Sequence, residues 1–177
     1  MAETIEQAEA IPEGYPQAPA GLSTAAAALD PSMIWQRIEA YVAHRWSARD
    51  VVWIIEGPGG WKPPLTPATI ASVEIWNGET WETVMLSPSP LGGYCLPGCG
   101  PYRFTGTAGG GDVPAAVSEA FRRLAEYMAS KPGKAGATTE GITAGSISLT
   151  HRRSASWLAE AIQNSGAGDL LRTYRRV

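Results

Sequence analysis

Few residues in this sequence have the chemistry of a reactive site. There are two cysteines, Cys95 and Cys99, and two histidines, His44 and His151. Two thiolates with distant histidines lack the close ligand spacing of a closed zinc site. A serine or cysteine nucleophile needs a histidine oriented beside it, and no G-x-S-x-G motif occurs. We therefore predict no catalytic residue, no metal site and no cofactor, with both cysteines as buried or semi-buried free thiols.

A run of three glycines, Gly109 to Gly111, stands just before a predicted helix. Backbone N–H groups at such a position can bind phosphate. The run lacks the G-K-[ST] ending of a P-loop and the G-x-G-x-x-G spacing of a dinucleotide site. A loop that leads into the helix is the simpler interpretation.

The C-terminal residues 150–177 form a second candidate region, because they hold five of the fourteen Lys and Arg residues. These five are Arg152, Arg153, Arg172, Arg175 and Arg176. Three interpretations are open: a solvated basic end, a rim around an apolar segment that inserts into a protein socket, or contacts with nucleic-acid phosphates. In the second interpretation Leu170, Leu171 and Tyr174 insert into the socket.

Seven tryptophans are many for 177 residues. Trp53, Trp61, Trp76 and Trp81 fall in a strand-rich region, where they would form either a carbohydrate-stacking face or the core and a subunit interface. Strand alternation places Trp76 on the less buried face, which favours an interface. We predict a subunit interface at Trp76, Trp81 and, on the aromatic stripe of the first helix, Trp35.

Apolar periodicity and turn signals predict the main elements. They are a helix from Pro31 to about Arg45 with Asp30 as its N-cap, a strand over 51–56, a hairpin of 70–76 and 80–85 around Asn77-Gly78, a second hairpin of 94–96 and 101–105, and a helix over 115–130. The fold class is therefore α+β. We expect a small helical bundle with an antiparallel β-hairpin insertion and an extended C-terminal helical tail.

The 177 residues are 44% hydrophobic and 18% charged, with a net charge of −3, which is typical of a soluble globular protein. The predicted organisation is a disordered or extended N-terminal arm (1–28), a core (29–130) with a β insertion (51–106), a flexible linker (131–149), and a C-terminal docking helix and tail (150–177). No apolar run reaches about 18 residues, and the acidic N-terminal region is unlike a secretory signal. We expect a protein that is located in a cytoplasm, or in a particle assembled there, and makes no membrane contact.

Three pieces of the sequence resemble the head–tail connector (adaptor) proteins of long-tailed bacteriophages and phage-derived gene transfer particles. The first runs from Pro31 through Arg49 to Ile55. The second, residues 107–129, reads TAGGGDVPAAVSEAFRRLAEYMA, and the third, residues 161–176, reads AIQNSGAGDLLRTYRR. Together they cover most of the chain from Leu29 onward, whereas the Trp-rich insertion and the acidic N-terminal region have no counterpart in the resemblance.

The resemblance implies a virion structural protein without enzymatic activity, located in the neck region and assembled in the bacterial host cytoplasm. It would be a homo-oligomer, usually a dodecameric ring, beneath the portal protein. The ring would join the DNA-filled head to a stopper or tail-terminator protein and surround the genome channel, contacting genomic DNA without sequence specificity. The alternatives are a stopper or tail-completion protein of the same neck, or a Trp-lined carbohydrate-binding module.

Members of this family bind the portal through the C-terminal segment. Carried over to this sequence, the portal-docking residues are Trp157, Leu158, Ile162, Leu170, Leu171 and Tyr174. The five arginines of the tail would then contact portal or DNA.

Overall fold

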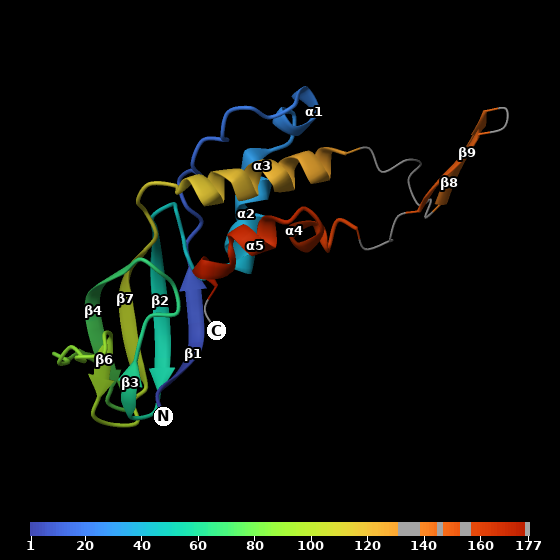
Figure 1. The fold of residues 1–177 in the computed structure, drawn as a ribbon. Coiled ribbons are helices and arrows are strands. Elements are labelled where there is room, and N and C mark those ends of the chain that lie inside the picture. The colour runs from blue at the N-terminus through green and yellow to red at the C-terminus, as the bar shows by residue number, and fades with distance from the viewer. Residues whose placement is uncertain (131–138, 145–146, 153–156, 176–177) are drawn as a thin grey trace. The chain divides into compact units, whose positions relative to one another are not determined.

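A five-stranded antiparallel sheet is the main element of the first of two compact units (Figure 1). The computed structural model describes residues 1–130, 139–144, 147–152 and 157–175. The strand order is β1-β2-β7-β4-β5. These strands are β1 (Glu3–Glu9), β2 (Arg49–Glu56), β4 (Ala68–Trp76), β5 (Trp81–Thr83) and β7 (Tyr102–Ala108). Two short strands, β3 (Gly59–Trp61) and β6 (Tyr94–Leu96), pair as a separate antiparallel ribbon.

The sheet unit comprises Met1–Pro16, Tyr41–Asp112 and Tyr174–Val177, and the helical unit comprises Gln17–Ala40 and Val113–Thr173. The helical elements are α1 (Thr24–Ala27), α2 (Pro31–Tyr41), α3 (Ala115–Ala129), α4 (Ala161–Asn164), α5 (Ala167–Leu170) and the 3₁₀ helix η1 (Arg172–Tyr174). Strands β8 (Thr139–Ala144) and β9 (Ile147–Arg152) pair as an antiparallel hairpin. The chain thus combines helices with antiparallel sheets, as the sequence predicts. Among the described helices, none has the length and hydropathy needed to cross a bilayer.

The core of the sheet unit lies between the five-stranded sheet and the β3–β6 ribbon. Alternate residues of β2 and β7 point into it, and the ribbon adds further apolar side chains. The largest of these buried residues are Trp53, Ile55, Trp61, Leu96, Tyr102 and Phe104. The ring centroids of Trp61 and Phe104 are 4.4 Å apart. Burial of each such side chain contributes about 1.5–3 kcal/mol, so this core is the main source of stability of the unit.

The helical unit has its own core, built on one face of α3. Phe121 and Leu124 of α3 are fully buried, and the Phe121 ring lies 5.1 Å from that of Trp35 in α2. On the C-terminal side, α4 and α5 pack against α3 and bury Ala167 and Leu171 completely. The helix α1 is fixed by Ser23, whose backbone N–H and hydroxyl both donate to the Glu126 carboxylate of α3.

The N-terminal arm predicted over 1–28 is wrong as a free segment. Strand β1 pairs along β2 from Glu3 to Glu9, and α1 belongs to the helical unit. The polar side chains of β1 explain the pairing. Gln7 accepts a hydrogen bond of 2.9 Å from the indole N–H of Trp53, and Thr4 accepts one of 2.9 Å from that of Trp61. An acidic strand is thus held by satisfying two indole donors from the core.

The β insertion predicted over 51–106 is part of a larger sheet, because β1 adds an edge strand from outside that range. The hairpin at Asn77-Gly78 is confirmed, although its loop spans 77–80 and is fixed by the Asn77 side chain, which accepts from the backbone N–H groups of Glu79 and Thr80. The second predicted hairpin is wrong, since β6 pairs with β3 and β7 lies between β2 and β4.

The linker and tail predictions also change. The predicted flexible linker, 131–149, includes β8 and the start of β9, while 131–138 and 145–146 lie outside the described residues. The tail predicted over 150–177 is not a separate docking element, because α4 and α5 pack on α3 within the helical unit. Removing it would therefore expose the buried face of α3.

Gly106 provides a test of the sheet. It pairs with Val51 on one side and Ile70 on the other, and a Cβ atom there would lie 2.1 Å from the backbone oxygen of Thr69. We expect Gly106→Ala to lower the free energy of unfolding by about 1–3 kcal/mol, because the added methyl group forces β4 away. Gly60→Ala is the matched control, since a Cβ at Gly60 meets nothing within 4 Å. Equal urea-denaturation midpoints for the two variants would contradict the strand packing.

Candidate functional site

The segment that follows α2 leaves the helical path and becomes extended. His44 forms a parallel bridge with Thr66. The backbone N–H of Arg45 donates to Thr66 O at 2.9 Å, and the N–H of Thr66 donates to Ala43 O at 3.0 Å. The helix predicted to continue to about Arg45 therefore ends at Tyr41. Three aromatic side chains of this stretch, Tyr41, His44 and Trp46, are called the aromatic site below.

Tyr174 lies against the aromatic site. Its ring centroid is 5.6 Å from that of His44 and 5.5 Å from that of Trp46, in both cases edge-on. Edge-on aromatic pairs of this kind contribute about 0.5–1.5 kcal/mol each beyond the burial of their area. The backbone oxygen of Tyr174 also accepts a hydrogen bond of 3.0 Å from the N–H of Ala43. Both the ring and the backbone of Tyr174 are thus bound.

Arg175 extends the same contact. Its guanidinium carbon lies 4.6 Å from the centroid of the Tyr41 ring, and its Nη1 donates to the Tyr41 hydroxyl at 3.2 Å. A guanidinium over an aromatic face is attracted by the ring quadrupole. Tyr174 and Arg175 are called the C-terminal segment below. They are bound by aromatic, cation–π and backbone contacts together. All of these residues belong to the sheet unit.

His44 stays uncharged in this setting. Burial lowers the pKa of His44 below its ordinary value of 6.5, and the charge of Arg45 lowers the pKa further. A neutral imidazole at pH 7 avoids placing a second cation beside the arginine.

A half-buried ion pair holds the extended segment in place. The carboxylate of Glu9, in β1, accepts from Nε of Arg45 at 2.8 Å and from its Nη2 at 3.1 Å. Arg45 also donates to the backbone oxygen of Val42 at 2.9 Å. Arg49 adds a second positive charge, with its Nη1 3.8 Å from Glu9. Burial raises the pKa of Glu9, but the hydrogen bond to Arg45 and the charges of Arg45 and Arg49 outweigh it, so the net pKa is lowered.

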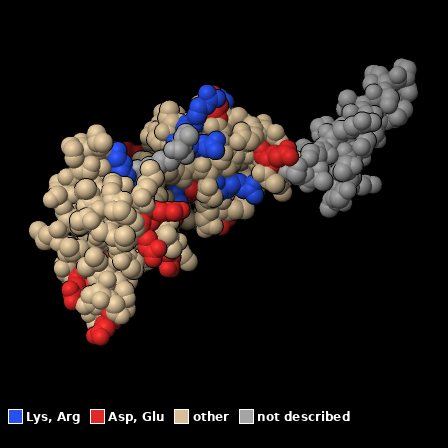
Figure 2. All heavy atoms as spheres, turned by 90° about the horizontal axis from the view of Figure 1, so that it is seen from below, with Lys and Arg blue, Asp and Glu red and all other residues tan. Residues whose placement is uncertain are grey.

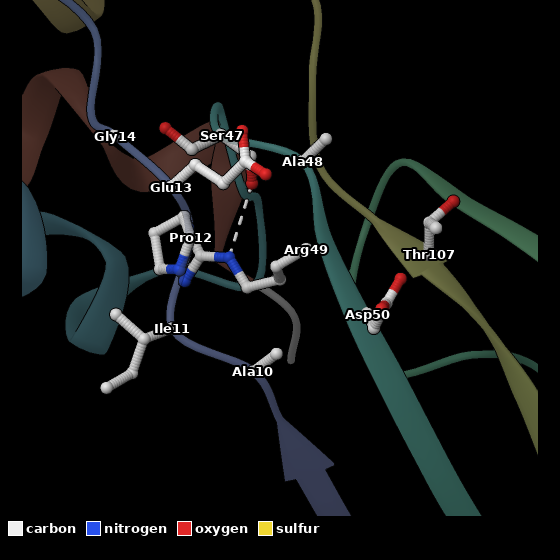
Figure 3. A pocket seen from close by; sticks show the side chains of 10 residues that line it. All are labelled: Ala10, Ile11, Pro12, Glu13, Gly14, Ser47, Ala48, Arg49, Asp50 and Thr107. Carbon is white, nitrogen blue, oxygen red and sulfur yellow. Dashed lines mark hydrogen bonds between the residues drawn. The ribbon is translucent and has the colours of Figure 1, made fainter.

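An open pocket of about 630 Å³ lies beside Arg49 (Figure 3). It is lined by residues 10–14 after β1, by residues 47–50 at the start of β2, and by Thr107. The Arg49 side chain is fixed by its hydrogen bond of 3.2 Å to Ser47 O and by the Tyr15 ring, 5.8 Å away. The lining includes the carboxylates of Glu13 and Asp50 as well as Arg49, so it presents no single charge to a ligand.

The predicted docking residues lie in different environments. Leu171 is fully buried in the helical unit and has no surface to offer a partner. Leu158 is 41% exposed. The remaining three of the helical unit, Trp157, Ile162 and Leu170, are half-buried, and the Trp157 ring lies 5.6 Å from that of Tyr127. The structure thus uses Leu171 and Tyr174 internally and leaves Leu158 at the surface.

The predicted basic contacts are also divided. Arg172 is exposed and pairs with Asp169 at 2.8 Å, and Arg175 contacts Tyr41. Arg153 and Arg176 lie outside the described residues, and Arg152 is described only as the last residue of β9.

The predicted interface tryptophans do not form one surface. Trp35 is 1% exposed and packs on Phe121, so its assignment to an interface is wrong. Trp76 and Trp81 are half-buried. Their ring centroids are 5.4 Å apart, and the ring planes are tilted by 58° to each other. The Arg103 guanidinium lies 4.5 Å from the Trp81 ring centroid, and its Nε binds Glu74 at 2.7 Å.

Trp53 and Trp61 are buried in the core of the sheet unit. The four tryptophans of the predicted strand-rich region therefore do not share the exposed platform that a carbohydrate-stacking face requires.

The other candidates stay apart. Cys95 and Cys99 are free thiols, but both are exposed, so the prediction that they are buried or semi-buried is wrong. The glycine run of 109–111 forms a connection between β7 and α3. Within the described residues, no group of three or more His, Cys, Asp or Glu side chains is arranged to hold a metal ion. Neither the family models nor the curated proteins searched contain a match to this chain.

Sequence reasoning named Tyr174 and Arg175 but missed their partners. The predicted helix from Pro31 to about Arg45 includes Tyr41, and His44 is considered only as a ligand or base. No short sequence window contains both the C-terminal pair and its partners, because the Arg175–Tyr41 contact joins residues 134 positions apart.

The Glu9 ion pair predicts a pH-dependent stability. We expect Glu9→Gln to lower the free energy of unfolding by about 1–2 kcal/mol at pH 7, because it removes a charge-assisted pair with the buried side chain of Arg45. The pKa of Glu9 is lowered by folding, so its contribution is fully present above the ordinary value of 4.5 and is lost as pH falls through the folded-state pKa. Thermal or urea unfolding of both proteins between pH 3 and 7 measures the difference.

Glu6→Gln is the control for that comparison, because Glu6 is exposed on the same strand and lies opposite the uncharged Ile54. It should leave stability nearly unchanged at every pH. A Glu9→Gln effect of the same size at pH 3 and pH 7 would show that the carboxylate charge is not responsible.

Proposed function

We propose that this protein is a head–tail adaptor, a virion structural protein that forms a ring beneath a portal and surrounds the genome channel. One observation carries the proposal. Three pieces far apart in the sequence resemble adaptor proteins, and helices from all three pack together: α2 contacts α3 through Trp35 and Phe121, and α3 contacts α4 and α5. The unmatched Trp-rich stretch belongs to the other unit.

In this proposal the small helical bundle of the adaptor fold corresponds to the helical unit. The β insertion corresponds to the sheet unit, enlarged by β1. An insertion that is a separate packing unit leaves the helix packing of the bundle intact, which is why a bundle and a five-stranded sheet can occur in one chain.

Portal docking falls on the exposed part of the C-terminal region. Leu158 and Arg172 are exposed there, next to the half-buried Trp157 and Ile162. Leu171 has the different task of fixing α5 on α3. The Arg37 guanidinium donates to the backbone oxygen of Leu158, which holds the start of this surface against α2.

The charges of the two units support separate tasks. The sheet unit contains ten acidic and six basic residues, and the helical unit contains seven acidic and eight basic residues. On the face shown in Figure 2, the acidic side chains gather mainly over the sheet unit and the basic ones over the helical unit. In a ring, the helical unit is therefore the better candidate for contact with portal carboxylates or DNA phosphates, without base readout.

Cryo-microscopy of purified particles tests the function directly. We expect this protein as a ring of identical copies at the neck, between portal and tail, and tailless heads when it is absent. Particles that contain the protein elsewhere, or assemble complete tails without it, would refute the adaptor assignment.

The docking surface has its own test. We expect Arg172→Glu to weaken portal binding about threefold at low salt and less at high salt, because an exposed charge at an interface rim is worth up to about 1 kcal/mol and is screened. Lys62→Glu, an equally charge-reversing change at an exposed residue of the sheet unit, is the control. Co-sedimentation with purified portal at several salt concentrations measures both, and equal losses would place docking elsewhere.

A further inference from the structure

We propose that the aromatic site is a peptide-binding site for the C-terminal segment, and that in the assembled ring it takes this segment from a neighbouring copy of the chain. The binding site is Tyr41, His44 and Trp46, and its ligand is the Tyr174–Arg175 pair. The proposal that the aromatic site binds this pair rests only on the contacts described above. The exchange between copies rests on the proposed adaptor ring, and it supplies a subunit contact for that ring.

The contacts have the form of peptide recognition. The site offers one backbone donor, the N–H of Ala43, to the oxygen of Tyr174. It makes two T-shaped ring contacts with the Tyr174 side chain and offers one ring face with a hydroxyl to Arg175. The backbone oxygen of Tyr174, its ring and the guanidinium of Arg175 are thus each bound by different groups of the site. The sequence contains one other Tyr-Arg pair, Tyr102–Arg103, and Tyr102 is 1% exposed within the sheet, so it cannot compete.

The position of the segment in the chain favours exchange. Tyr174 packs with the sheet unit, whereas the residues up to Thr173 belong to the helical unit. The boundary between the two packing units therefore falls directly before the ligand residues. The contact joins residues 134 positions apart in the sequence, so it is a non-local contact. A neighbour's identical segment makes identical contacts, which is why such exchange is a low-cost route to assembly.

An exchanged segment also gives the correct symmetry. One copy supplies the segment and the next supplies the aromatic site, so the contact is heterologous. Repeated around an axis, heterologous contacts close into a ring when the rotation permits. Within a closed ring every site is filled and no segment is left over, so the exchange costs no contact that the isolated chain makes.

The first experiment tests the binding site with a labelled, C-terminally amidated peptide of residues 168–175 as the probe. The protein is the full chain with Tyr174→Ala and Arg175→Ala, which leaves its aromatic site vacant. We expect saturable binding by fluorescence anisotropy. Wild-type chain, whose own segment fills the site, should bind about tenfold more weakly by competition. A peptide that carries alanine in place of the tyrosine keeps both arginines and should also lose about tenfold.

Failure of the peptide to bind the vacant chain would overturn the proposal, and so would equal binding of the two peptides, which would indicate charge attraction alone. Because Tyr41→Ala could unfold the segment after α2, the site is also tested with Tyr41→Phe, which keeps the ring and removes the hydroxyl that accepts from Arg175. We expect weaker binding of the peptide to Tyr41→Phe in the vacant chain, with an unchanged unfolding midpoint. Unchanged binding would remove Tyr41 from the site.

The second experiment tests exchange between copies. One full-length chain carries Tyr174→Ala and Arg175→Ala, and the other carries Tyr41→Phe and His44→Ala, which weakens the site and keeps the Tyr41 ring. Each alone should be monomeric by native mass spectrometry. The mixture should give a 1:1 heterodimer and nothing larger, because one intact segment and one intact site remain per pair. A mixture that stays monomeric would overturn the exchange, and larger species would show that copies meet through another surface.

These outcomes are separable from failure of the adaptor function, since neither experiment contains portal or particles. Heterodimers from a protein that cryo-microscopy does not find at the neck would refute the adaptor and leave the exchange standing. A neck ring formed by a chain with Tyr174→Ala and Arg175→Ala would refute the exchange and leave the adaptor standing.

Discussion

The pairing of Glu9 with Arg45 is the constraint on which the rest of the sheet unit depends. The side chains of Arg45 and Arg49 are only 10% and 6% exposed, and charges buried to this extent carry a large desolvation cost that ion pairing must offset. Glu9 offsets that cost and at the same time joins the last residue of β1 to the segment that follows α2. Arg45 also donates to the backbone oxygen of Val42, the residue before the Ala43 donor that binds Tyr174. Edge strand, ion pair and aromatic site therefore form one cooperative arrangement.

Local patterns were sufficient where an element is stabilised by its own residues. The alternation of β2, the apolar face of α3 and the Asn77-Gly78 turn could all be predicted, because their signals lie within one short window. Strand β1 could not. Its acidic composition indicates disorder, and what orders it are acceptors for the indole N–H groups of Trp53 and Trp61, which are 46 and 57 positions away in the sequence. No window that contains β1 alone holds that information.

Only part of the candidate site could be predicted from the sequence, for the same reason. Tyr174 and Arg175 were conspicuous as an aromatic and basic end, but their partners share the spacing of the helix that precedes them. Tyr41 continues the apolar stripe of α2, and the helix was therefore predicted to run on to about Arg45. Backbone hydrogen bonds that join Thr66 to Ala43 and to Arg45 instead hold this stretch in an extended conformation. The helical spacing of the sequence thus favours one structure here, and backbone pairing with a distant residue favours another. Periodicity cannot show which of them forms, because the pairing residue lies elsewhere in the sequence.

The two tasks proposed for the C-terminal region divide within η1, between Thr173 and Tyr174. On the helical-unit side, Leu171 is buried, and Leu158 and Arg172 are exposed. On the sheet-unit side, Tyr174 and Arg175 bind the aromatic site. A portal-binding surface must be rigid to be specific, whereas an exchanged segment must be separable from the surface that precedes it. The change of packing unit between Thr173 and Tyr174 allows both in adjacent residues, so portal contact and subunit contact need not compete for the same side chains.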